Sequence, residues 1–252
     1  MSSEIRKEVI LERLDRDQRV SVVELSAEFG VSGETIRRDL KDLEAEGVVR
    51  RVHGGAIPAG RTADTPITER IKLNALEKDE VAGLARGLIN DDCVIFLDTG
   101  TTTLALARRL IGFKKLRLYT NSLRIAQAAC EHFGVQVQMT PGRLRPVEQD
   151  LVGYDTISYI QQFHFDMVFM GAAAINADYG FMDFEEDEAR IRQNLLAQTS
   201  RSVMLADHSK FGKVGNVITA PFNRVHTLVT DRRPPEAVET AVKAEPLEII
   251  HA

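Results

Sequence analysis

The 252-residue sequence predicts an α/β protein with a small, mainly helical N-terminal domain and a larger domain built on a parallel sheet. Two observations lead to this prediction. Up to about residue 47, apolar residues recur at the spacing of amphipathic helices. From residue 92 onward, short apolar runs alternate with helical stretches, which is the pattern of a largely parallel sheet covered by helices.

The N-terminal domain is expected to contain three helices. The first covers residues 4–16, the second follows Ser21 and ends at Gly30, and the third begins at Ser32 and stops near Gly47. The apolar residues that share one face are Ile5, Val9, Ile10 and Leu14 in the first helix, Val23, Leu25 and Phe29 in the second, and Ile36, Leu40 and Leu43 in the third. These stripes must face a common core.

The tight turn Gly30–Ser32 joins the second and third helices in the manner of a helix-turn-helix. A weakly alternating strand at 48–52 and a hairpin turn at Gly54-Gly55 before Ala56-Ile57 predict a wing. The outer face of the third helix is polar, and it suits a DNA major groove because arginine binds guanine edges and hydroxyls reach phosphates. Taken alone, this helix is equally well explained as a solvated surface helix.

The charge distribution gives DNA binding no general support. The net charge is −5, and the first 53 residues carry ten Lys and Arg against twelve Asp and Glu. Affinity for DNA therefore requires basic side chains to cluster on one side of the domain. The residues expected to contact DNA are Ser32, Thr35, Arg37, Arg38, Lys41, Arg51 and His53.

The composition is that of a globular protein, with 44% hydrophobic and 27% charged residues. No apolar run approaches the roughly 18 residues of a membrane span, and the first residues are no signal peptide, so we expect a cytoplasmic protein that does not enter the membrane. Cys93 and Cys130 lack the spacing of a disulfide framework or a zinc site, and we expect neither a metal nor a cofactor.

Residues 58–66 lack periodicity and contain two prolines and a glycine, which indicates a linker. A helical stretch from residue 67 to 88 follows, and it could contact a partner subunit. The predicted division is therefore a DNA-binding domain at 1–57, a linker and connecting helix at 58–76, and an α/β domain at 77–252.

The second domain is expected to contain seven strands and five helices after the connecting stretch. The strands are expected at 93–97, 116–119, 135–139, 167–170, 203–205, 227–229 and 247–250, and the helices near 102–111, 122–132, 154–162, 185–199 and 235–242. Ligands of such sheets bind beyond the carboxyl ends of the strands.

The run Asp98-Thr99-Gly100-Thr101-Thr102-Thr103 stands between the first of these strands and its helix. A glycine and several hydroxyls at a helix N-terminus offer N–H and O–H donors to an anion, and the helix dipole favours negative charge. A strand-to-helix turn with capping threonines explains the run about equally well. It is no Walker loop, because Gly-Lys-Thr does not follow.

Other strand ends add polar groups. Thr120-Asn121-Ser122 follows the second strand, Gly171 follows the fourth, and Asp207 to Gly212 follow the fifth. Lys210 could bind a phosphate as a point charge. Asp98, Asp183, Glu185 and Glu188 could accept hydrogen bonds from sugar hydroxyls, although the acids from 185 to 188 could equally stabilise the dipole of their own helix.

Ten N-terminal residues carry a resemblance to a known family: Arg6, Ile10, Leu14, Ser32, Thr35, Ile36, Arg37, Arg38, Asp39 and Leu40. Their spacing, together with Arg51-Val52-His53-Gly54-Gly55-Ala56, is similar to the signature of the DeoR family of bacterial repressors, also called the glycerol-3-phosphate repressor type. The resemblance favours DNA binding over a plain surface helix.

The resemblance extends over nearly the whole chain. It includes Glu69, Arg70, Asn74, Lys78, residues 98–103, residues 120–122, Gly171, Gly180, Glu188 and residues 207–212. It implies a sensor domain related to ribose-5-phosphate isomerase and coenzyme A transferases that binds phosphorylated sugars or polyols. The chain departs from the family at Pro141-Gly142-Arg143, where a Gly-Gly pair is common, and at Asn176, where an acid is common.

The leading hypothesis is a transcriptional repressor of a carbohydrate or polyol operon that acts as a homo-oligomer, a dimer or a tetramer, on operator DNA. The residues expected to bind the phosphorylated effector are Asp98, Thr99, Gly100, Thr101, Thr102, Thr103, Asn121, Gly171, Asp183, Glu185, Glu188 and Lys210. An isomerase-like enzyme is the alternative, which the helix-turn-helix argues against, and an activator of the same fold is a third reading.

Overall fold

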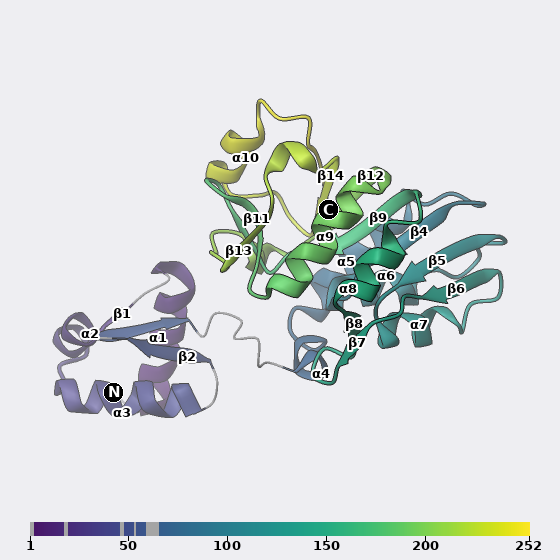
Figure 1. Cartoon of the computed structure of the whole chain (residues 1–252). Coiled ribbons are helices and arrows are strands. Elements are labelled where there is room, and N and C mark those ends of the chain that lie inside the picture. The colour runs from purple at the N-terminus through teal and green to yellow at the C-terminus, as the bar shows by residue number, and fades with distance from the viewer. Residues whose placement is uncertain (1–2, 18–19, 46–47, 53, 59–65) are drawn as a thin grey trace. The chain divides into compact units, whose positions relative to one another are not determined.

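The computed structural model of the protein describes residues 3–17, 20–45, 48–52, 54–58 and 66–252. The chain separates into two compact units, Met1–Thr62 and Ala63–Ala252 (Figure 1). The predicted DNA contact His53, the predicted helix end at Gly47 and most of the predicted linker lie outside the described residues.

The first unit is a winged helix-turn-helix, as predicted. Its helices are α1 (Ser3–Asp17), α2 (Val22–Phe29) and α3 (Gly33–Ala45), and its antiparallel sheet has the order β1-β3-β2, formed by Val20–Ser21, Gly55–Pro58 and Val49–Val52. Gly30 ends α2 with a φ of 64°. Ser32 Oγ accepts the N–H of Thr35 at 3.2 Å, which confirms the predicted cap of α3. Ser21 precedes α2 but makes no cap hydrogen bond through its side chain.

One cluster of buried side chains holds this unit together. It consists of Ile10, Leu14, Val20, Val22, Leu25, Ile36, Leu40, Leu43, Val49 and Ala56. Two predicted core residues are wrong, since Ile5 is 51% exposed and Val23 is 75% exposed. Val22 takes the inward position instead, because it lies on the same helix face as the buried Leu25, three residues later. On α1 the buried position next to Ile5 belongs to Arg6, whose Nε lies 2.7 Å from Asp39 Oδ2 on α3.

Seven parallel strands form the main sheet of the second unit, in the order β15-β14-β12-β9-β4-β5-β6. Figure 1 labels those from β14 to β6. Their bounds are Val94–Leu97 (β4), Leu116–Thr120 (β5), Val135–Met139 (β6), Phe165–Gly171 (β9), Thr199–Leu205 (β12), Thr227–Thr230 (β14) and Glu248–His251 (β15). Each overlaps one of the seven predicted strands, so the predicted parallel sheet is confirmed.

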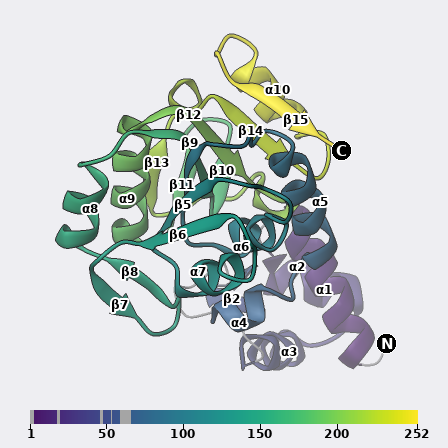
Figure 2. The ribbon, with the colours of Figure 1, turned by 90° about the vertical axis from the view of Figure 1, so that its right-hand side faces the viewer.

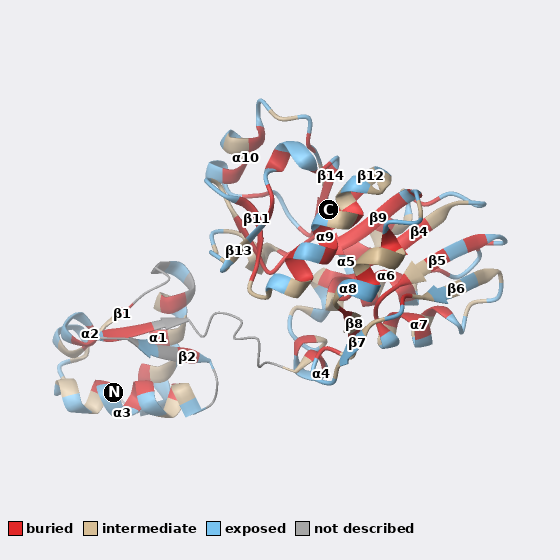
Figure 3. Ribbon diagram, in the orientation of Figure 1, coloured by how far each residue is buried: buried red, intermediate tan, exposed pale blue. Residues whose placement is uncertain are grey.

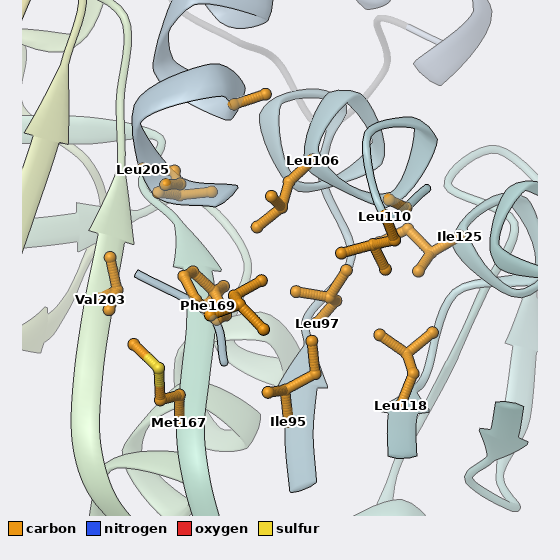
Figure 4. Close-up of a cluster of buried hydrophobic side chains, with 14 of the residues drawn as sticks. Ile95, Leu97, Leu106, Leu110, Leu118, Ile125, Met167, Phe169, Val203 and Leu205 are labelled. Carbon is orange, nitrogen blue, oxygen red and sulfur yellow. The ribbon is translucent and has the colours of Figure 1, made fainter. Parts of the chain in front are cut away.

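Helices cover both faces of this sheet (Figure 2). One face packs against α5 (Ala75–Arg86), α6 (Thr101–Arg108) and α7 (Leu123–Ala129), and the other against α8 (Tyr154–Ile160), α9 (Glu186–Ala197) and α10 (Glu236–Val242). Along β4, Ile95 and Leu97 point into the first layer, where Figure 4 shows them facing Leu106 of α6. Phe96 points into the second layer. The central strands are therefore buried on both faces (Figure 3).

Several short elements were not predicted. They are the hairpin β7–β8 (Arg143–Arg145, Asp150–Val152), a small antiparallel sheet of β10 (Ala174–Asn176), β11 (Gly180–Asp183) and β13 (Val217–Ala220), and the 3₁₀ helices η1 (His208–Lys210) and η2 (Phe222–Arg224). The predicted helical stretch 67–88 is interrupted. It is divided into α4 (Ile67–Arg70) and α5 by a turn whose last residue, Asn74, has a φ of 49°. No helix in the described part of the chain is long and apolar enough to cross a membrane.

Gly55 lies where β3 approaches β1 closely, and a Cβ there would stand 1.9 Å from the carbonyl oxygen of Val20. We expect Gly55→Ala to disrupt this pairing and to lower the free energy of unfolding of the first unit by about 2 kcal/mol. Thermal unfolding followed by circular dichroism would measure the change.

A matched control is Gly33→Ala within α3, where the added Cβ would stand 3.4 Å from Val22 Cγ1. Alanine is favoured over glycine in helices by roughly 0.5–1 kcal/mol, so this variant should be neutral or stabilising. A Gly55→Ala protein as stable as the Gly33→Ala control would contradict the close approach of β1 and β3.

Candidate functional site

The outer face of α3 carries two basic side chains that no described residue neutralises. Arg38 and Lys41 are exposed and form no ion pair with the described residues. Arg37, also exposed, lies 3.2 Å from a glutamate one turn earlier. Ser32 and Thr35 share a hydroxyl hydrogen bond of 2.9 Å at the start of the helix. The face therefore presents cations and hydroxyls of the kinds that contact phosphates and base edges.

Arg51 on β2 is tied to the C-terminal end of α3. Its Nε lies 2.6 Å from Glu44 Oε2, and its backbone N–H donates to Glu44 Oε1 at 2.9 Å. These bonds hold the pKa of Glu44 below its usual value. Since a guanidinium has five N–H donors, Arg51 keeps donors for another partner while its position is fixed.

In the second unit, the loops after β4, β5 and β6 are joined at the carboxyl edge of the sheet. Asn121 Oδ1 accepts the N–H of Thr99 at 3.0 Å, and Thr120 Oγ1 donates to the carbonyl of Leu97 at 2.7 Å. The N–H of Thr140 donates to the carbonyl of Thr120 at 3.0 Å. The predicted groups at 99 and 121 are thus brought together, with Thr140 beside them.

Four buried side-chain atoms at this edge have no hydrogen-bond partner among the described residues. They are Thr99 Oγ1, Asn121 Nδ2, Thr140 Oγ1 and Asp207 Oδ2. Nδ2 is the group that Asn121 has left to donate, because its oxygen already accepts the N–H of Thr99. A buried polar atom without a partner costs free energy, so this edge favours a ligand or water that supplies the missing bonds.

The predicted anion loop opens α6, with Gly100 as the residue before the first turn. Thr102 and Thr103 are buried, and Thr103 Oγ1 donates back to the carbonyl of Gly100 at 3.0 Å. Gly100 and Thr101 remain partly exposed. The first N–H groups of a helix lack partners within it, so this turn offers backbone donors and the positive end of a dipole.

A buried arginine, Arg192 on α9, lies under this loop. Its Nε is 2.7 Å from Asp98 Oδ2, it contacts the carboxylate of Asp183, and its Nη2 is 3.3 Å from Glu188 Oε2. Glu188 Oε1 also lies 3.0 Å from Arg145 Nη2, so the guanidinium of Arg145 is a second cation in this cluster of charged side chains.

Arg145 in turn lies 2.6 Å from Asp150. The cluster therefore contains two guanidinium groups and four carboxylates, and burial and this excess of acids both contribute to a raised pKa of Asp98. Burial raises the pKa of Asp98 to about 6; Arg192 opposes this rise, and Glu188 and Asp150 add to it. The prediction that Asp98, Asp183 and Glu188 accept sugar hydroxyls stays a prediction, and the structure shows them bound to arginine.

The loop after β12 contributes Asp207 and Lys210. Burial alone would raise the pKa of Asp207, but Lys210, the Ser209 hydroxyl and Lys78 outweigh it and lower that pKa. Lys210 is partly exposed at the end of η1. Asp207 therefore stays ionised beside two ammonium groups.

The remaining predicted effector residues lie at the ends of elements. Gly171 ends β9 and Glu185 precedes the first turn of α9, and both are partly exposed. Sequence reasoning missed Thr140, Arg145, Arg192 and the role of Asp207 as a site residue. A signal existed for Arg192, since it follows Glu188 by four residues, the spacing of one helix face. Among the described residues, no group of three or more His, Cys, Asp and Glu could hold a metal ion.

A winged helix-turn-helix unit, followed by an α/β unit on a parallel sheet, is the architecture of a transcription regulator with a sensor domain. The chain belongs to the DeoR family: residues 6–61 match the DeoR-like helix-turn-helix domain, and residues 73–232 match the DeoR C-terminal sensor domain.

Named relatives cover nearly the full length of the chain. The putative aga operon transcriptional repressor of Escherichia coli O157:H7 is 34% identical over 95% of this chain and 90% of its own length. The glycerol-3-phosphate regulon repressor of Escherichia coli K12 is 31% identical over 91% of each chain. Ribose 5-phosphate isomerase A from Methanocaldococcus jannaschii superposes with a TM-score of 0.39 at 18% identity, over 55% of each chain.

The raised pKa of Asp98 predicts a specific pH dependence. Its carboxyl keeps its proton in the folded chain up to about pH 6, whereas the unfolded chain releases it near pH 3.8. This difference in pKa stabilises the folded chain fully at a pH below the pKa of Asp98 in the unfolded chain. The stabilisation is lost as the pH rises through the pKa of Asp98 in the folded chain. We expect wild type to lose up to about 3 kcal/mol relative to Asp98→Asn between those two values.

Denaturant unfolding of both proteins across this pH range measures the difference. A difference in stability that is constant with pH would mean that Asp98 titrates alike in the folded and unfolded chains.

Proposed function

We propose that the protein is a cytoplasmic transcriptional repressor of a carbohydrate or polyol catabolic operon, controlled by a phosphorylated sugar or polyol. The observation that carries the proposal is a set of buried side-chain atoms without hydrogen-bond partners in the described chain, on Thr99, Asn121 and Thr140 in the loops after β4, β5 and β6; the first of these loops leads into α6. The names of two relatives, an aga operon repressor and a glycerol-3-phosphate regulon repressor, support the same reading.

The phosphate would bind at the turn from Thr99 to Thr103. Backbone N–H groups of α6, the hydroxyl of Thr99 and the amide of Asn121 are all hydrogen-bond donors, which a phosphate oxygen requires. Lys210 would add a point charge. Gly171, Asp183, Glu185 and Glu188 complete the proposed site, with Asp183 oriented by Arg192 and Glu188 by Arg192 and Arg145.

We propose that the first unit binds double-stranded operator DNA. Ser32, Thr35, Arg37, Arg38 and Lys41 would enter the major groove, with Arg51 and His53 supplied by the wing. A homo-oligomer, a dimer or a tetramer, would place two such helices on operator half-sites. An effector can control this binding only if its affinities for the DNA-bound and the free protein differ.

Arg38→Ala should weaken operator binding without changing effector binding. Loss of one unneutralised cation from the recognition face should raise the Kd for operator about tenfold and reduce the slope of log K against log salt by about one. A gel-shift titration at several salt concentrations measures both.

Arg13→Ala is the matched control, because Arg13 lies on α1 of the same unit and its Nη1 is paired with Glu28 Oε2 on α2 at 2.9 Å. Equal losses in the two variants would argue against α3 as the recognition helix. Unchanged operator affinity in Arg38→Ala would remove Arg38 from the interface.

Lys210→Ala should weaken the binding of the phosphorylated effector. A screen of glycerol 3-phosphate, ribose 5-phosphate and glucose 6-phosphate by thermal shift would identify a ligand, since a specific binder raises Tm by mass action. Calorimetry with that compound should give a Kd at least about tenfold weaker for Lys210→Ala, as expected for loss of a charge-assisted contact.

Lys243→Ala removes an exposed lysine at the end of α10 and should bind as wild type does. A Lys210→Ala protein that binds equally well would exclude Lys210 from the site. Turnover of ribose 5-phosphate by the purified protein would favour an isomerase-like enzyme instead.

A further inference from the structure

The turn between α4 and α5, residues 71–74, is held by two loops of the proposed effector site. Arg70, just before the turn, is buried and pairs with Glu148 in the β7–β8 loop. Asn74, the last residue of the turn, donates from Nδ2 to Asp207 Oδ1 at 3.0 Å. The turn is thus fixed at one end to the hairpin that carries Arg145 and at the other to the loop after β12.

Hydrogen bonds from Lys78 to two backbone carbonyls also stabilise the turn. Lys78 Nζ, which is buried, donates to the carbonyl of Arg70 at 2.7 Å and to that of Leu73. Asn74 holds a left-handed backbone with a φ of 49°, a conformation that costs free energy in residues other than glycine and is least unfavourable for asparagine and aspartate. The bond to Asp207 therefore stabilises a local conformation that the backbone would not otherwise prefer.

The two carboxylate oxygens of Asp207 have different surroundings. Oδ1 accepts from Asn74 and from the N–H and hydroxyl of Ser209. Oδ2 is buried and has no hydrogen-bond partner among the described residues. A hydroxyl of a ligand that donates to Oδ2 would act on the same carboxylate that holds Asn74.

The turn stands close in sequence to the connection between the two units. Only α4, four residues long, lies between it and the residues that lead to the DNA-binding unit. A helix of one turn has no independent stability, so the position of α4 depends on its anchors.

We propose that residues 70–78 form a latch that reads occupancy of the effector site through Asp207 and conveys it to the chain leading to the DNA-binding unit. The ligand class is a polyol or sugar phosphate with a hydroxyl that donates to Asp207 Oδ2, and this inference rests on the proposed function. Asn74 is a positioning residue in the latch. Asp207 is a ligand contact and the point where binding is coupled to the turn.

The test uses the full-length chain and the Asn74→Gly variant. Glycine adopts a positive φ readily, so the variant removes the amide without straining the turn. Asp92→Gly is the matched control, because Asp92 is an exposed residue with a φ of 65° in a different loop. The probe is whichever of glycerol 3-phosphate, ribose 5-phosphate and glucose 6-phosphate raises the Tm of wild type most.

Two quantities are measured for each protein. The first is the Kd for the probe, measured by calorimetry. The second is the ratio of the operator Kd with the probe to the operator Kd without it, measured by gel shift on a DNA duplex that wild type selects from a random pool. Asn74→Gly should have a Kd for the probe within about threefold of the wild-type value. Its ratio of operator Kd values should move most of the way to one, since coupling and affinity are separate free energies. Asp92→Gly should match wild type in both.

Asp207→Asn adds a second variant. It can keep the oxygen that holds Asn74 but replaces the other acceptor with a donor, so its Kd for the probe should rise at least about tenfold. An Asn74→Gly protein with the wild-type ratio, or an Asp207→Asn protein with the wild-type Kd, overturns the latch while leaving the proposed function intact. If none of the three compounds binds wild type, the proposed function fails and the latch fails with it.

Discussion

The guanidinium of Arg192 is the group on which the sensor unit depends. It binds Asp98 at the end of β4, Asp183 at the end of β11 and Glu188 on its own helix, and so joins the main sheet, the small antiparallel sheet and α9. An unpaired charge in such a place would cost several kcal/mol, so these elements cannot separate without a large loss of stability. The turn from Thr99 onward therefore starts from a fixed base, which is what a preorganised anion site requires.

The main architecture could be predicted because its signals are long and regular. The strand β4 and the segment Met167–Met170 of β9 are continuous, largely buried apolar runs. Gly30, Ser32 and the Gly54-Gly55 pair mark the boundaries of the helix-turn-helix and the wing. The strands β7, β8 and β10 could not be predicted, since three residues contain no measurable period. β7 and β8 pair with each other, and β10 pairs with β11 a few residues later, without an alternating apolar pattern that would mark them as strands.

The location of the site could be predicted better than its contacts. Asp98, Asn121 and Lys210 were placed by one rule, that polar groups after parallel strands meet at the carboxyl edge. Which of these polar groups can still bind a ligand depends on the register of the strands and on hydrogen-bond or ion-pair partners from other elements. Asp98 is bound by Arg192, whereas Thr140 keeps an unpartnered hydroxyl because its neighbour Thr120 is satisfied by a backbone carbonyl. A single sequence contains no direct record of such pairings.

The DNA-binding unit has its own core and its own buried ion pair, Arg6 with Asp39, which joins α1 to the recognition helix α3. A signal from the sensor unit therefore has no need to refold α3, and breaking that pair would cost more free energy than an allosteric ligand normally supplies. In the proposed latch, the coupling acts instead on the chain that leads from α4 to the DNA-binding unit. The one-turn helix α4 suits this task, because the single hydrogen bond from Asn74 to Asp207 beyond it can be exchanged within the few kcal/mol that a small ligand provides, while the buried Arg70–Glu148 pair stays intact.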